Sequence, residues 1–249
     1  MRIVIFLGLG LALMVHATPV QFQSSERQTT LIELYTSEGC SNCPRAEKWL
    51  SKLKNDSRLW NDLVPVAFHI DYWNNRRRDE LSDPQFSARQ ESYARLWKSA
   101  LIYTPEYVLN GKEWYNLFAL RGLPAVPSSK PGILRVFSDD NTHWLASFVP
   151  SGAPVEKYEL TVAVLASGVG SDARVGANSG RNLQHDFAAL SLTTHPLVSG
   201  TNGFRGTFVI DSNPKGISGH LALAAWVTHS GRLEPLQATG GWLSVPEKQ

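Results

Sequence analysis

The chain has only two cysteines in 249 residues, and this scarcity limits the metal sites it can form. A structural zinc site needs about four ligands, and there is no second cysteine pair to supply them. Both methionines, Met1 and Met14, lie near the N-terminus, so cleavage of that segment would leave none. Because soft Cu(I) sites often recruit thioether ligands, this absence counts against a copper carrier.

The chain also lacks a strong excess of charge of either sign. Its formal net charge is +2, which provides no field to attract nucleic acid or anionic lipid. The basic run Arg76-Arg77-Arg78 is followed at once by Asp79 and Glu80. We therefore predict a solvated loop whose charges compensate one another, and no nucleic-acid partner.

Long apolar runs are missing except at the N-terminus. Arg2 precedes the thirteen-residue apolar run IVIFLGLGLALMV, and Val15-His16-Ala17 resembles a cleavage site. The run is shorter than the roughly 20 residues that span a bilayer. We predict a signal peptide at residues 1–17 and a mature protein that is exported, periplasmic or secreted, with no stable membrane anchor.

Both cysteines are found in the segment Cys40-Ser41-Asn42-Cys43-Pro44. The preceding LIELYTSEG is typical of a strand that ends in a turn, and the following RAEKWLSKL of an amphipathic helix. Cys40 is thus expected at a helix N-terminus, where backbone N–H groups lower a cysteine pKa from about 8.5 to roughly 3.5–7.5. Pro44 suits the first helical turn. The expected core face of this helix excludes Glu47.

Two other interpretations of the cysteine pair remain open. A structural disulfide closing so short a loop would add little stability in the chain-entropy picture. A copper site could use Cys40, Cys43 and His69. On the strand that carries His69, Asp71 shares its face and could orient the imidazole, although a hydrogen-bonded core histidine is an alternative. We assign no role to His185 and Asp186.

The chain divides into two parts of different pattern. Residues 28–125 alternate strand and helix, with strands at LIELYT, LVPVAFHI and EYVLNG and a second helix from Pro84 to Trp97. Asp83 is a cap residue for that helix, and Asn110-Gly111 is a hairpin signal. After a Pro/Ser/Gly-rich stretch at 122–132, residues 132–249 have the period-two pattern of a β-rich, sandwich-like domain.

Five segments resemble successive motifs of one bacterial family. They are LIELYTSEGCSNCPRAE, VAFHIDYWN, DPQFSARQESYA, YTPEYVLNG and SGRNLQHDF. Together they resemble an exported, thioredoxin-like family known as domain-of-unknown-function family 1223. The match covers nearly the whole mature chain. After DYWN, NRRRDELSDP stands where the family usually has a Gly-Trp-Lys-Asp-Pro stretch.

The resemblance implies an α/β thioredoxin-like fold followed by a β-rich part, and it implies roles for individual residues. Cys40 would attack a partner disulfide, and Cys43 would resolve the mixed disulfide. Pro105 would be a cis-proline facing the dithiol, with Thr104 beside it in the substrate-binding position; an ordinary trans proline at a strand start is the alternative. Glu33 would be a buried acid that takes a proton from Cys43, or else a residue that points to solvent.

These observations predict an exported thiol–disulfide oxidoreductase. Its redox-active disulfide would need no further cofactor, and with no third cysteine it would exchange electrons with an external redox partner. The substrate would be a protein or small-molecule thiol or disulfide. The alternative is a non-catalytic binding protein, either the copper carrier described above or an adaptor that uses the thioredoxin-like part as a scaffold.

Overall fold

The computed structural model describes residues 19–74, 79–115, 122, 125–153, 157–173, 176–211 and 213–243. The predicted signal peptide and the run Arg76-Arg77-Arg78 lie outside the described residues. The predicted stretch at 122–132 is described in part.

Strands dominate the described chain. The helical segments are α1 Cys43–Ser51, η1 Lys52–Asn55, α2 Pro84–Trp97 and η3 Gly176–Asn178. The strands of the N-terminal half are β1 Val20–Gln23, β2 Thr30–Thr36, β3 Leu63–His69, β4 Glu106–Leu109 and β5 Lys112–Glu113. Those that follow are β6 Gly132–Ser138, β7 His143–Pro150, β8 Tyr158–Ser167, β9 Val169–Asp172, β10 Asn182–His185, β11 Ala188–Gly200, β12 Gly203–Val209, β13 His220–His229 and β14 Gln237–Trp242.

Local sequence signals placed several of these elements correctly. Helix α2 has the predicted bounds, and the Asp83 side chain caps it by accepting a hydrogen bond from the Gln85 backbone N–H at 3.0 Å. Asn110 and Gly111 both have positive φ, at 46° and 80°, in the turn that joins β4 to β5. Two consecutive positive φ values are typical of the hairpin turns that Asn-Gly favours.

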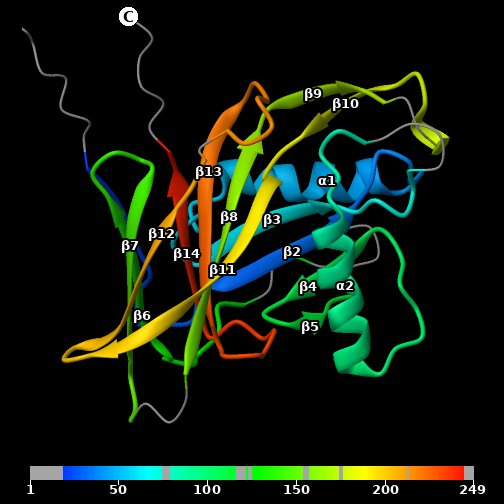
Figure 1. The fold of residues 1–249 in the computed structure, drawn as a ribbon. Coiled ribbons are helices and arrows are strands. Elements are labelled where there is room, and N and C mark those ends of the chain that lie inside the picture. Colours follow the sequence, from blue (N-terminus) through cyan, green and yellow to red (C-terminus); the bar gives the residue numbers. More distant parts are fainter. Residues whose placement is uncertain are drawn as a thin grey trace, which may run out of the picture.

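The strands of both halves join in one mixed, 12-stranded sheet. Its main path runs β1-β6-β7-β12-β11-β3-β2-β4-β5, and β8, β13 and β14 extend from β11. The link between the halves is parallel: Ala188 of β11 pairs with Ala67 of β3, and the Ala67 backbone N–H donates to Phe187 O at 2.8 Å. Figure 1 shows α1 and α2 beside β2, β3 and β4, with β6, β7 and β12 on the opposite side of the molecule.

The predicted fold class, an α/β thioredoxin-like fold followed by a β-rich sandwich-like part, is wrong. The described residues form a mostly β-structure with two α-helices, and β2, β3 and β4 belong to the same sheet as β8, β11 and β13. The alternating pattern over residues 28–125 located the individual elements, but it contains no information about pairing with β11. The proposed domain boundaries at 28–125 and 132–249 stay predictions.

Burial explains why the two halves associate. Every residue of β2 and of β3 is buried, so both faces of these strands need a covering layer. One apolar core accordingly combines residues of the N-terminal half, such as Leu34 and Phe68, with Ala163 and Trp226 from β8 and β13. The second core lies among the later strands and is centred on residues such as Trp144, Phe148 and Leu160.

A buried ion pair joins β2 to α2 within the first core. The Glu33 carboxylate accepts hydrogen bonds from Arg89 Nε at 2.6 Å, Tyr93 Oη at 2.7 Å and Tyr35 Oη at 3.0 Å. The side chains of Glu33 and Arg89 are 0% and 9% exposed. The Arg89 guanidinium also lies 5.1 Å from the Trp226 ring centroid. The ion pair is therefore packed against residues of both halves.

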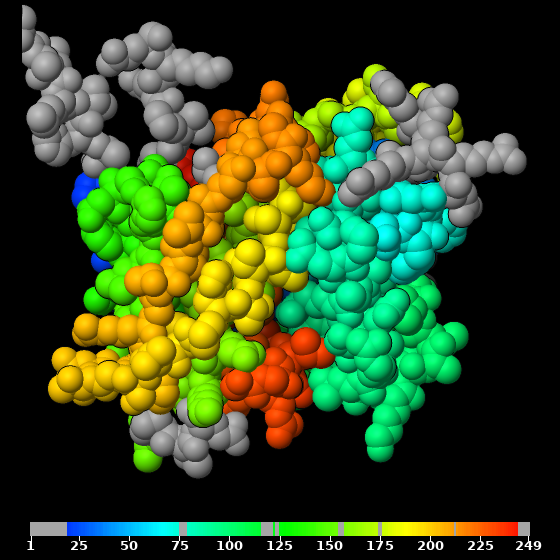
Figure 2. All heavy atoms as spheres, in the orientation of Figure 1, coloured from blue at the N-terminus to red at the C-terminus, as the bar shows by residue number. Residues whose placement is uncertain are grey.

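The loop that includes Leu233 and Glu234 also contacts the N-terminal half of the chain. Tyr93 Oη lies 3.2 Å from Leu233 O, and a Cβ atom at Gly111 would lie 2.9 Å from the Cα of Glu234. The β4–β5 turn thus approaches this loop so closely that it excludes a side chain at Gly111. In Figure 2 the red-orange loop lies directly against the blue-green segment that includes α2.

We expect Glu33→Gln to lower the free energy of unfolding by about 3–5 kcal/mol, because it leaves the buried Arg89 charge without a carboxylate partner. Urea denaturation measures the change. The matched control is Glu91→Gln, whose exposed side chain lies 3.5 Å from Arg95 and whose loss should change stability by less than about 0.5 kcal/mol. Equal small effects of both substitutions would contradict the role given to the Glu33–Arg89 pair.

Candidate functional site

The cysteines form a disulfide at the point where a buried strand meets a helix. Strand β2 leads into the turn, and α1 begins at Cys43 with Pro44 in its first turn. Cys40 and Cys43 are bonded to each other, with their Cα atoms 5.4 Å apart. The disulfide therefore lies at the N-terminus of α1, as the sequence predicted.

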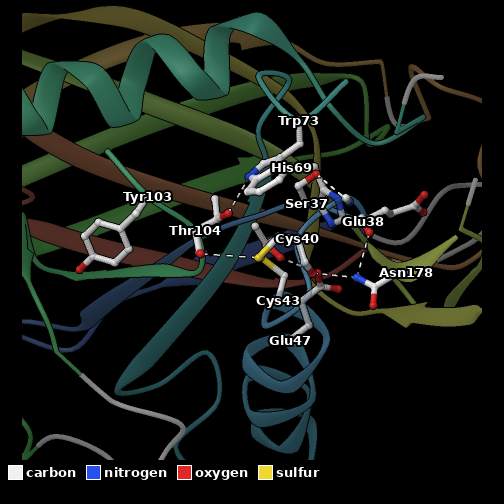
Figure 3. Close-up of a disulfide and its surroundings, with 12 residues drawn as sticks. Ser37, Glu38, Cys40, Cys43, Glu47, His69, Trp73, Tyr103, Thr104 and Asn178 are labelled. Atoms are coloured by element: carbon white, nitrogen blue, oxygen red, sulfur yellow. Dashed lines mark hydrogen bonds between the residues drawn. A yellow bond between two sulfur atoms is a disulfide. The ribbon is translucent and has the colours of Figure 1, made fainter. Parts of the chain in front are cut away.

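An aromatic and polar cover lies over the disulfide. Cys40 is only 3% exposed and Cys43 is fully buried. Cys40 Sγ lies 3.5 Å from Thr104 O, and Trp73 Nε1 donates a hydrogen bond to Thr104 Oγ1 at 2.9 Å (Figure 3). A Cβ atom at Gly39 would lie 3.0 Å from Trp73 Cβ. A partner could reach the sulfur of Cys40 only after this cover moves.

Asn178, from the second half of the chain, holds the turn before Cys40 in place. Its Nδ2 donates to Glu38 O at 2.9 Å and to Cys40 O at 2.7 Å, and the residue is fully buried. In the same segment, a Cβ atom at Gly176 would collide with Gly39 O, and Gly176 has φ of 56°. Glycine is needed there for both reasons.

A buried group of carboxyl and imidazole side chains lies next to the disulfide. His69 ends β3, and its Nδ1 is 2.9 Å from Asp79 Oδ2, with both side chains 0% exposed. Asp79 Oδ2 also accepts a hydrogen bond from the Glu38 backbone N–H at 3.0 Å. The sequence correctly indicated a carboxylate partner for His69 but named the wrong one. Asp71 instead accepts a hydrogen bond from Ser87 Oγ at 2.5 Å.

Glu47 and His185 complete this group. Glu47 lies on α1 one turn after Cys43, and its Oε2 is 2.5 Å from His185 Nδ1. Its Oε1 accepts a hydrogen bond from Thr36 Oγ1 at 2.5 Å. His185 Nε2 is 3.3 Å from Glu38 Oε1 and 2.9 Å from Ser171 Oγ. The expectation that Glu47 lies off the buried face of its helix is wrong, because the residue is 5% exposed.

The close packing of acids and imidazoles shifts several pKa values. Burial disfavours the charged form of His185, but hydrogen bonds to Glu38 and Glu47 outweigh it and raise its pKa to about 10. Burial likewise raises the pKa of Glu47, yet the His185 bond and charge lower it overall. For Asp79, His69 and two backbone N–H donors outweigh burial and bring the pKa to about 2.

The other predicted site residues lie as follows. The Thr104–Pro105 peptide bond is cis, and Thr104 contacts Cys40, but their catalytic and substrate-binding roles stay predictions. Glu33 is buried, so the alternative of a solvent-facing side chain is excluded. Its carboxylate bonds to Arg89, Tyr93 and Tyr35, and its role as a proton acceptor for Cys43 is untested.

The copper site predicted from Cys40, Cys43 and His69 also remains a prediction. The two sulfurs are bonded to each other, and the group of possible ligand atoms found within 4.8 Å of one another comes from Glu47, His69 and His185. The sequence analysis did not identify Glu38, Asp79 or Asn178 as residues of this site. One local signal was available: Glu47 follows Cys43 by four residues and so shares its helix face.

A family model described as a protein of unknown function (DUF1223) matches residues 31–228. The chain belongs to the DUF1223 family. Family membership, predicted from the five motifs, is thereby confirmed, and every residue of the group around the disulfide lies within the matched range. No curated protein matches the chain.

Two solved structures share the fold of this DUF1223 protein. A protein from Agrobacterium tumefaciens, AGR_C_4864, is 20% identical with a TM-score of 0.59, over 90% of this chain and 98% of its own. HBP35 of Porphyromonas gingivalis is 12% identical with a TM-score of 0.56, over 88% of this chain and 76% of its own. At these identities the likeness concerns the fold alone.

Among the described residues, no helix is long and apolar enough to cross a membrane.

A carboxyl group follows Pro105 and helps to fix the cover over Cys40. Gln90 Nε2 donates to Glu106 Oε2 at 2.5 Å and to Tyr103 O at 2.8 Å. Burial is the main cause that raises the pKa of Glu106 to about 7. The loop that carries Thr104 is thus held by a carboxyl group that changes charge near neutral pH.

Glu106 therefore predicts a pH dependence of stability. The folded state binds this proton more tightly than the unfolded state, whose glutamate pKa is about 4.3, so stability is highest below that pH and falls as pH rises toward 7. We expect Glu106→Gln to remove this fall and to raise the free energy of unfolding at pH 8 by about 1–3 kcal/mol. Urea titrations of both proteins from pH 4.5 to 8 measure it. Parallel curves would contradict the assignment, and Glu91→Gln is the control.

Proposed function

We propose that this DUF1223 protein is an exported thiol–disulfide oxidoreductase that acts through Cys40 and Cys43. The observation that carries the proposal is the pairing itself: both cysteines of the chain form one disulfide at the N-terminus of α1. A helix N-terminus stabilises a thiolate, which is the nucleophile of disulfide exchange. A disulfide between cysteines only three positions apart adds little to stability, which favours a chemical role.

The reaction balances with two cysteines and one partner disulfide. The Cys40 thiolate attacks one partner sulfur, forms a mixed disulfide and releases the other sulfur as a thiolate. The Cys43 thiolate then attacks Cys40 Sγ, restores the Cys40–Cys43 disulfide and releases the second partner thiol. Two electrons and two protons have then passed from the protein to the substrate. An external thiol must reduce the protein again, or the same steps run in reverse and oxidise the substrate.

The cover over Cys40 would act as a selective gate in this reaction. Trp73 is 39% exposed, so its ring presents surface to a partner while its hydrogen bond to Thr104 keeps it over the sulfur. Figure 3 shows Trp73 and Thr104 on the same side of the disulfide. A substrate that replaces these contacts would gain access to the disulfide, whereas small oxidants and reductants would react slowly.

The reduction potential of the disulfide is the first test. We expect a value between about −120 and −270 mV, the range of exchange proteins, measured in glutathione or dithiothreitol buffers by counting alkylated thiols. A value below about −300 mV would identify a stable structural disulfide and overturn the proposal.

Trapping tests which cysteine attacks. In oxidised glutathione, Cys43→Ser should accumulate a mixed disulfide at Cys40, because the resolving thiol is absent. Cys40→Ser is the matched control, and its remaining thiol should react slowly because it is fully buried in the native protein. Mass spectrometry of the intact proteins measures both. Equal rates in the two variants would contradict the assigned order of attack.

Trp73→Ala tests the gate. Loss of its hydrogen bond to Thr104, worth about 1 kcal/mol, should accelerate reduction of the native disulfide by dithiothreitol about fivefold. Tyr115→Ala, which removes a more exposed aromatic side chain on the chain segment after β5, should leave the rate unchanged. If both variants react like the unmodified protein, Trp73 does not control access.

A further inference from the structure

The buried group next to the disulfide contains one polar atom that has no partner. His69 is fully buried, and its Nε2 makes no hydrogen bond to any described residue. Its other nitrogen, Nδ1, is held by Asp79 at 2.9 Å. An unsatisfied polar atom in a protein interior costs about 1–3 kcal/mol, so its presence needs an explanation.

Two other potential ligands lie beside His69. One ligand atom each from His69, His185 and Glu47 lie within 4.8 Å of one another, and all three residues are buried. The rings of His69 and His185 are nearly perpendicular, with centroids 4.9 Å apart. These atoms come from β3, β10 and α1, so the tertiary fold assembles the group.

Each of these three side chains is also held by a hydrogen bond to a residue outside the group of three. Asp79 holds His69, Thr36 holds Glu47 at 2.5 Å, and Ser171 holds His185 at 2.9 Å. Metal-binding histidines almost always donate their other N–H group to such a partner, which orients the ring. The histidine–carboxylate pair His69–Asp79, with Nε2 left free, has this arrangement.

We infer that His69 Nε2, His185 Nδ1 and a Glu47 carboxylate oxygen form a binding site for a divalent transition-metal ion, of which Zn²⁺ fits best. Two imidazoles and one carboxylate, with a fourth position left for water or substrate, are a ligand set typical of zinc. The donors are nitrogen and oxygen, so the site is distinct from the Cys40, Cys43 and His69 set considered for copper.

Binding requires one proton to leave. Glu47 Oε2 and His185 Nδ1 are joined by a hydrogen bond of 2.5 Å, whose proton the ion would have to replace. Two ligands of a tetrahedral Zn²⁺ ion lie about 3.4 Å apart, given bond lengths of about 2.1 Å. The ion would therefore replace this proton and separate the two groups by about 1 Å, while His185 Nε2 keeps its N–H for Ser171 or Glu38.

A cavity lies beside the group and meets it at Glu38 and Ser171. It has a volume of about 490 Å³, and its lining includes Glu38, Ser171, Asp172 and Glu80. Glu38 and Ser171 contact His185 Nε2 directly. The carboxyl groups along the wall favour a cation over an anion, although Lys215 also lines the cavity.

The experiment uses the oxidised protein without a polyhistidine tag, after removal of metal with a chelator. Calorimetric titration with ZnCl₂ should show one equivalent bound. His69→Gln and His185→Gln should each weaken binding by more than about 100-fold, and Asp79→Asn by about 10- to 100-fold. His143→Gln, which changes an exposed histidine beside Asp140, and the double variant Cys40→Ser/Cys43→Ser should bind as tightly as the unmodified protein.

X-ray absorption on the zinc-loaded, unmodified protein gives a result even if the buried variants fail to fold. It should show nitrogen and oxygen ligands at about 2.0–2.2 Å and no sulfur at about 2.3 Å. A sulfur ligand, binding that survives both histidine substitutions, or the absence of one bound equivalent would each overturn the inference. None of these results depends on disulfide exchange, so the two proposals can fail separately.

Discussion

The bond between Asp79 and His69 is the interaction on which the rest of the site depends. Asp79 Oδ2 accepts hydrogen bonds from the His69 ring and from the Glu38 backbone N–H, so one carboxylate oxygen joins the end of β3 to the turn before Cys40. Because Asp79 occupies Nδ1, the other ring nitrogen of His69, Nε2, has no hydrogen bond to a described residue, and Glu47 and His185 lie close to the His69 ring. The Asp79 carboxylate thus fixes both the turn that carries the disulfide and the orientation of the His69 imidazole.

The local elements of this protein were predictable because their signals are local. Asp83 and Pro84 start α2, Asn110-Gly111 turns β4 into β5, and the pattern around Cys40 and Cys43 places a disulfide at a helix start. Each signal depends on residues within a few positions of one another. The parallel pairing of β11 with β3 depends on a contact between Ala67 and Ala188, and no local pattern specifies it. This pairing makes the fold one large mixed sheet in which the N-terminal strands share a core with the later ones.

The same distinction between local and long-range signals applies to the candidate site. The cysteines are three positions apart, and the sequence identifies them as a pair, whereas Glu47 and His185 are 138 residues apart and the sequence does not pair them. The strand pattern offers Asp71 as a carboxylate that could orient His69, because it lies two residues away on the same face, but Asp79 reaches the ring from the following loop. Glu47 is a charged residue on an amphipathic helix, so the helical pattern assigns it to the solvent-facing side although it is buried. Its hydrogen bonds with His185 and Thr36, which no local pattern shows, explain why burial of Glu47 is tolerated.

Burial of the disulfide constrains how the protein can react. The second half of the chain contributes Asn178, which donates to the carbonyl groups of Glu38 and Cys40, and the first half contributes Trp73 and Thr104 on the other side. A sulfur enclosed from both sides reacts only through local opening, and the frequency of opening depends on how many of these bonds break together. Trp73 has a half-exposed ring and one described side-chain hydrogen bond, whereas Asn178 is fully buried and its side chain takes part in three. Opening on the Trp73 side therefore requires less free energy, and this asymmetry sets the direction from which a substrate disulfide must approach Cys40.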